Sequence, residues 1–166
     1  MKKSLAIFFV GGVLGALGGA GGMLIVYPFI FPPPQVNEKV STEAVFVAEA
    51  TFREGASGQD AAHWGRGGLR IYDVGDSVLL ELQDDFQVGA GPNFWLYLNH
   101  HSAINDEDDF AADEERVRLA KLKSFSGSQV YKISAADFAR TRAITVWCDT
   151  FNQYIASADL PPKDKT

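Results

Sequence analysis

The segment Ala143-Ile-Thr-Val-Trp-Cys-Asp-Thr150 gives the clearest indication of the fold class. Its side chains divide into two alternating sets, with Ile144, Val146 and Cys148 on one face and Ala143, Thr145 and Trp147 on the other. A period of two, together with β-branched and aromatic residues, is typical of a β-strand. We therefore expect a strand here, with Cys148 on the face that points into the core.

Six more short runs read as strands, at residues 43–53, 68–73, 77–82, 94–98, 116–123 and 129–133. Glycine and proline clusters separate the runs and mark turns. Seven short strands at such spacing indicate an all-β domain, built as an antiparallel β-sandwich or a barrel-like sheet. One helical turn is expected at 134–140, where Ser134 can act as the N-cap and Asp137 follows three residues later.

The N-terminal region has a different composition. The 27 residues from Leu5 to Phe31 carry no charge, whereas Lys2 and Lys3 precede them. As a helix this stretch would be about 40 Å long, enough to cross a hydrocarbon core of about 30 Å. We expect one N-terminal transmembrane helix, and the positive-inside rule places the C-terminal domain outside the cytoplasm, in the periplasm or at the cell surface.

Two further interpretations of this region stay open. Gly18-Gly19-Ala20 could serve as the cleavage site of a signal peptide, although 23–31 would then remain as an apolar tail. The spacing of Gly11 and Gly15 also allows a homodimer through the glycine-rich helix, but glycine is common in membrane helices in any case.

These patterns divide the chain into four parts: a cytoplasmic stub and anchor at 1–31, a proline-rich spacer at 32–40, the β domain at 41–160 and a polar tail at 161–166. Thirteen of the 15 basic residues and all 21 acidic ones lie from Glu38 onward, which gives this part a net charge of −8. An acidic body without a basic stripe disfavours nucleic-acid binding. A single cysteine excludes an internal disulfide.

An ordered series of short motifs runs through the body. It consists of Phe52, His63-Trp-Gly-Arg-Gly67, Leu82-Gln-Asp-Asp-Phe86, Gly91-Pro-Asn-Phe-Trp-Leu-Tyr-Leu98, Gly127-Ser-Gln-Val-Tyr131, Ile144-Thr-Val-Trp-Cys148, Phe151, Ala158 and Leu160. From Phe52 to Leu160 this series resembles the DM-thirteen domain, a small all-β module associated with DOMON-type sandwiches. The chain departs from that pattern at Asn93, where the family usually has aspartate, and at Gln153 and Ala156 in the last strand.

The resemblance implies a role in electron transfer, with the cysteine acting as a bare thiol or as the ligand of a prosthetic group such as haem. Cys148 is therefore the candidate redox residue, and His63 with Cys148 is the candidate cofactor-binding pair. A methionine ligand within the domain is excluded, because Met1 and Met23 both precede it. The residues themselves also allow Cys148 to be a small buried hydrophobic side chain and His63 to be a loop hydrogen-bonding group.

The remaining candidates are weaker. His100 and His101 point to opposite faces of a strand, so at most one of them can join Cys148 or His63. The segment 105–115 holds seven carboxylates without the spacing of a calcium loop, and we expect a solvated acidic loop.

Two functions follow from these observations. One is a redox module at a membrane surface, and the other is a binding module that recognises a glycan or a protein partner through 89–92 and 105–115. An enzyme is disfavoured because no nucleophile, acid and base set is evident.

Overall fold

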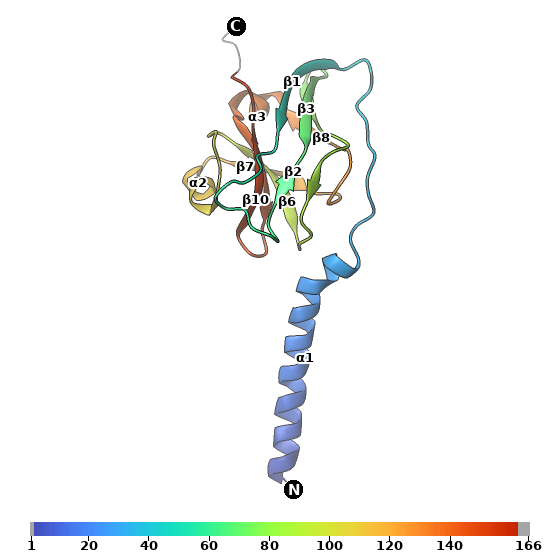
Figure 1. Ribbon diagram of the computed structural model, residues 1–166, viewed down its shortest axis with the longest axis vertical. Helices are drawn as coiled ribbons and strands as arrows, with labels where there is room; N and C mark the ends of the chain where they lie inside the picture. Colours follow the sequence, from blue (N-terminus) through green and yellow to red (C-terminus); the bar gives the residue numbers. More distant parts are fainter. Residues whose placement is uncertain (1, 163–166) are drawn as a thin grey trace.

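The structure, a computed structural model, describes residues 2–162, without the side chains at positions 2, 4–6, 24 and 25. A long helix, α1 (Lys2–Ile30), precedes an extended segment and a β domain (Figure 1). The strands of the domain are β1 (Val45–Thr51), β2 (Gly65–Arg66), β3 (Gly68–Asp73), β4 (Ser77–Leu82), β5 (Gln87–Val88), β6 (Phe94–Asn99), β7 (Val117–Lys121), β8 (Gln129–Ser134), β9 (Ala143–Cys148) and β10 (Gln153–Asp159). Two short helices, α2 (Glu107–Ala112) and α3 (Ala135–Arg140), complete it.

The domain is all-β, with antiparallel sheets, as the alternation predicts. One sheet has the order β1-β3-β4-β8, another has the order β10-β9-β6-β7, and β2 pairs with β5. The inward side chains of both four-stranded sheets form one core, which includes Leu80 and Ile133 from one sheet and Leu96 and Val146 from the other. Two sheets that share a core in this way make a β-sandwich.

The strand expected at 143–150 lies in the interior of its sheet, where β9 pairs with both β6 and β10. All six of its residues are buried, on both faces. Ile144, Val146 and Cys148 belong to the sandwich core, whereas Trp147 packs in a second cluster with Phe110. The opposite face of β9 is thus covered as well, by the segment that contains α2.

The strand β10 was not evident from alternation alone, because a bulge between Tyr154 and Ala156 breaks the period of two. Tyr154 consequently packs in the second cluster while Ile155 and Ala156 pack in the sandwich core. The helical turn expected at 134–140 is confirmed: Ser134 is the N-cap of α3 and its side chain accepts from the Asp137 backbone N–H.

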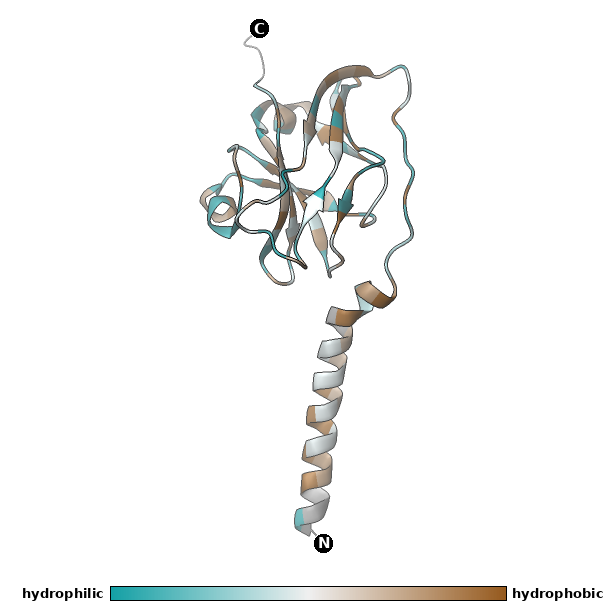
Figure 2. Cartoon of the chain, viewed as in Figure 1, coloured by the Kyte–Doolittle hydropathy of each residue, from teal (hydrophilic) through white to brown (hydrophobic). Residues whose placement is uncertain are grey.

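The helix α1 ends at Ile30, just before the three prolines, as expected. Its described large hydrophobic side chains are exposed, for example Phe8 at 74% and Leu17 at 67%, and Figure 2 shows the strongest hydrophilic colour of the helix at its N-terminal end. Within the described residues, no helix reaches the combination of length and apolarity that a membrane crossing needs, so the expected transmembrane helix is not supported. Most of the expected polar tail, 163–166, and Met1 lie outside the described residues.

The spacer at 32–40 lies along the domain and is fixed to it. The Glu38 carboxylate accepts from the Val130 backbone N–H at 2.8 Å and pairs with Lys123, and the Glu38 N–H donates to Ser128 O at 3.0 Å. Lys39 pairs with Asp84 at 2.8 Å. These contacts tie the spacer to β8 and to the turn after β4, and so place the end of α1 beside one end of the sandwich (Figure 1).

The core assignment can be tested at two adjacent leucines of β4. Leu80 is fully buried in the sandwich core, whereas Leu79 is partly exposed and lies on the other face of the sheet. Leu80→Ala is expected to lower the free energy of unfolding by about 2–5 kcal/mol, because it leaves a cavity in a packed core. Leu79→Ala is the matched control and should cost clearly less; equal losses in urea denaturation would contradict the orientation of β4.

Candidate functional site

The residue Cys148 ends β9, directly opposite Phe94 at the start of β6. It is 1% exposed, and its Sγ donates a hydrogen bond to Pro92 O at 3.1 Å. Pro92 belongs to the loop before β6, so this loop folds back over the end of β9. The thiol therefore lies where the sandwich core meets a group of loops.

These loops enclose a cavity of about 430 Å³ beside the thiol, which we call the Cys148 pocket. It is lined by Phe29, Ala62, His63, Ala90, Gly91, Pro92, Phe94, Cys148, Phe151 and Gln153. The volume falls within the range of small-molecule sites, about 300–1,000 Å³, and such sites are mostly apolar with a few polar groups. His63 and Cys148, 85 positions apart in the sequence, therefore line the same cavity.

The orientation of His63 is set by Asp60. One oxygen of the Asp60 carboxylate accepts from the backbone N–H groups of Ala62 and His63, at 2.7 and 2.8 Å. The other oxygen lies 2.9 Å from His63 Nδ1. The hydrogen bond from His63 lowers the pKa of Asp60 to about 2, so Asp60 is a carboxylate at neutral pH. A carboxylate only accepts, and the proton of the Asp60–His63 contact must therefore be on Nδ1.

Two glycines allow the loops to approach each other. A Cβ at Gly89 would lie 2.3 Å from Ala62 O, and a Cβ at Gly91 would lie 2.5 Å from the Phe94 ring. The Gly89 N–H also donates to Trp64 O at 2.9 Å. The loop that carries His63 is thus held against the loop that carries Pro92, and this contact brings His63 to the pocket.

The thiol of Cys148 is neutral under ordinary conditions. Burial raises its pKa above the usual value, and the backbone N–H groups of Phe151 and Thr150 offset only part of that effect. An S–H group that donates to Pro92 O agrees with this protonation state. Because the thiolate is the nucleophile and the metal ligand, simple thiol exchange is disfavoured here.

Haem held by Cys148 does not fit the residues present. A cysteine that ligates haem does so as a thiolate, so Cys148 would have to lose its proton to a bound iron and give up its hydrogen bond to Pro92 O. No lysine or arginine is among the described lining residues, so the haem carboxylates would have no cationic partner in the pocket. Of the two residues expected to bind a cofactor, His63 has an atom available for a ligand, because its Nε2 makes no hydrogen bond within the described residues.

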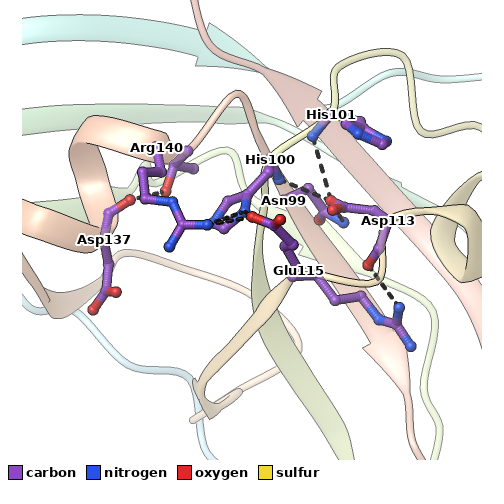
Figure 3. Close-up of polar contacts among 9 residues, drawn as sticks. Asn99, His100, His101, Asp113, Glu115, Asp137 and Arg140 are labelled. Atoms are coloured by element: carbon purple, nitrogen blue, oxygen red, sulfur yellow. Dashed lines mark hydrogen bonds and ion pairs between the residues drawn. The ribbon is translucent and has the colours of Figure 1, made fainter.

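The other two histidines are not brought to the pocket. His100 Nδ1 lies 3.2 Å from Glu115, whose carboxylate also pairs with Arg140 (Figure 3). The backbone N–H of His101 donates weakly to Asp113, at 3.4 Å. His100 and His101 belong to the turn after β6, and neither histidine lines the cavity beside Cys148.

The expectation of a solvated acidic loop at 105–115 is wrong in part. The segment contains α2, with Asp106 as N-cap, and the Phe110 ring stacks on Trp147 at 3.8 Å. Asp113 is 1% exposed and accepts from Asn99 and from the His100 N–H at 3.0 and 2.8 Å (Figure 3). Several of these carboxylates thus accept hydrogen bonds from backbone and side-chain donors. The high density of acidic residues in the sequence did not indicate this structural role. No cluster of metal-ligating side chains occurs among the described residues.

Sequence reasoning missed Asp60 and the aromatic walls of the pocket. The spacing Asp60-x-x-His63 was a usable signal, because aspartate commonly accepts from backbone N–H groups two and three residues later. The sequence offered no comparable indication that Phe94 and Phe151 line one pocket. Phe94 starts β6 and Phe151 lies in the turn between β9 and β10, so their proximity depends on how these elements pack.

The protonation state of Cys148 predicts its reactivity. The folded chain should react with iodoacetamide more slowly than the chain unfolded in denaturant at the same pH, because burial removes both the thiolate and access to it. Mass spectrometry of this single-cysteine chain reports the reaction directly. A folded chain that reacts as fast as the unfolded one would contradict a buried neutral thiol.

The pH dependence of stability tests the contact between Asp60 and His63. The folded pKa of Asp60 lies below its ordinary value, so the carboxylate stabilises the fold above about pH 4 and loses this effect as the pH falls towards 2. Asp60→Asn should lower the melting temperature at pH 6. The difference in melting temperature between this variant and the wild type should become smaller as the pH falls from 4 to 2. Asp76→Asn, at another exposed turn, is the control; a difference for Asp60→Asn that is independent of pH would contradict the assignment.

Comparison with known proteins identifies the family of the chain. Residues 52–160 match the model of the family described as Electron transfer DM13. No curated protein and no solved structure matches the chain. The matched region contains the whole Cys148 pocket apart from Phe29, and β1 precedes it. Since the match covers more than half of the chain, the protein belongs to the electron transfer DM13 family.

Proposed function

We propose that this protein transfers electrons and that its redox site is the Cys148 pocket, where Cys148 and His63 face a bound redox group. The observation that carries the proposal is the cavity itself, which joins the only thiol of the chain to a histidine with a free ring nitrogen. Perturbed titratable groups around an apolar cavity are typical of functional sites.

A bound group accounts for these residues better than the bare thiol does. A lone cysteine has no second thiol in the chain with which to form a disulfide. Its raised pKa also makes loss of the proton costly, and the thiolate is the form that reacts with oxidants and attacks disulfides. The role proposed for Cys148 is therefore to contact the redox group and tune it, while His63 exchanges a hydrogen bond with it.

The proposed location is the outer surface of a membrane, with α1 as the tether. The large hydrophobic side chains described along α1, such as Phe8 and Leu17, are exposed, and a helix with so much exposed apolar surface needs an apolar environment. Lys2 and Lys3 precede this helix, which favours an extracytoplasmic domain. The chain should sediment with the membrane fraction, and removal of residues 1–31 should release it.

One observation favours the alternative of a binding module. Val45, Phe46 and Val47 at the start of edge strand β1 are 66%, 54% and 44% exposed, and Phe46 packs edge-to-face on Tyr72. An exposed apolar edge suits a protein partner rather than a glycan. Under that alternative Cys148→Ser leaves partner binding unchanged, whereas Phe46→Ser weakens it.

The electron-transfer proposal is tested by voltammetry of the full chain, isolated in mild detergent with any group that it carries. The wild type should give a reversible wave, and Cys148→Ser should shift its potential or abolish it while the fold survives. The matched control is Ala158→Ser, which also places a hydroxyl in the sandwich core but outside the pocket. A wild type without a wave, or a wave unchanged in Cys148→Ser, would overturn the proposal.

A further inference from the structure

Three phenylalanine rings contribute to the lining of the Cys148 pocket. Phe94 is 3% exposed and forms the inner wall, opposite Cys148 in the sheet register. Phe151, from the β9–β10 turn, is 47% exposed and lies at the rim, as does Phe29 of α1 at 57%. Aromatic faces of this kind favour an apolar ligand with a planar ring.

The polar groups of the pocket are few and specific. Asp60 holds the Nδ1 proton of His63, so Nε2 accepts a hydrogen bond when the ring is neutral and donates one when the ring is protonated. A ligand oxygen that is a hydroxyl in one redox state and a carbonyl in the other can pair with His63 in both. Hydroquinones and quinones have this property, and they are planar and apolar as the walls require.

The position of the pocket indicates where such a ligand comes from. Glu38 and Lys39 fix the spacer to the domain, and Phe29, near the end of α1, lines the pocket. The pocket therefore borders an apolar helix. A cavity of about 430 Å³ can take the ring while an apolar tail extends along α1.

From these observations we propose that the Cys148 pocket binds the ring of a lipid-soluble quinone. This rests on the proposed electron-transfer function, to which it adds the chemical class of the redox group. His63 pairs with a ring oxygen, and Phe94 and Phe151 pack on the ring faces. Asp60 acts as a positioning residue, because it fixes the tautomer of His63 without lining the pocket.

The test uses the full chain in detergent and duroquinone as the probe. The four methyl groups of duroquinone block addition of the thiol to the ring, so reversible binding is measured. Isothermal titration calorimetry should show one site per chain. Ala62→Trp fills the pocket and should weaken binding roughly tenfold or more. Ala61→Trp is the matched control, since Ala61 is equally exposed and adjacent but does not line the pocket.

Each outcome separates this inference from the function on which it rests. A wild type that does not bind duroquinone, or equal affinities of Ala62→Trp and Ala61→Trp, would overturn the quinone assignment even if the voltammetric wave responds to Cys148→Ser. Binding that Ala62→Trp abolishes would support the assignment. If the wild type gives no voltammetric wave but binds duroquinone in this way, the electron-transfer function is contradicted and the quinone assignment stands.

Discussion

The strand β9 is buried on both faces, and the packing around it organises both hydrophobic clusters of the domain. One face of this strand completes the sandwich core through Ile144 and Val146, and the other is covered by the segment that holds α2. A strand so enclosed tolerates little displacement, because its residues are packed above, below and on both edges. Cys148 inherits this rigidity, and a thiol held in one position can contact a bound ring reproducibly.

The same constraint explains the unusual use of charge. The cover over β9 must itself be held in place, and carboxylates do this from within: Asp106 caps α2, Asp113 accepts from the turn after β6, and Glu107 accepts from the backbone N–H of Tyr154 at 2.9 Å. The acidity of this segment is therefore partly structural. Glu38 likewise holds the spacer against the domain, because its carboxylate accepts from the Val130 backbone N–H.

Alternation was enough to predict the all-β class, the strands β3 and β4 to the residue, and the orientation of Cys148 towards the core. It was not enough for β10, where the bulge at Tyr154 breaks the period, or for α2, whose single buried residue Phe110 lies among carboxylates. Cys148 and His63 could each be named from the sequence. The resemblance also named them as a pair, but the contact at Gly89 that brings the two loops together could not be predicted, because these loops are distant in the chain.

Histidine-ring NMR shows whether His63 and Cys148 share one cavity. The full chain, labelled at its three histidines, would be compared with the Cys148→Ser variant labelled in the same way. A shared cavity predicts that the ring resonances of His63 shift while those of His100 and His101 stay in place. An unmoved His63, or equal shifts of all three rings, would contradict the claim.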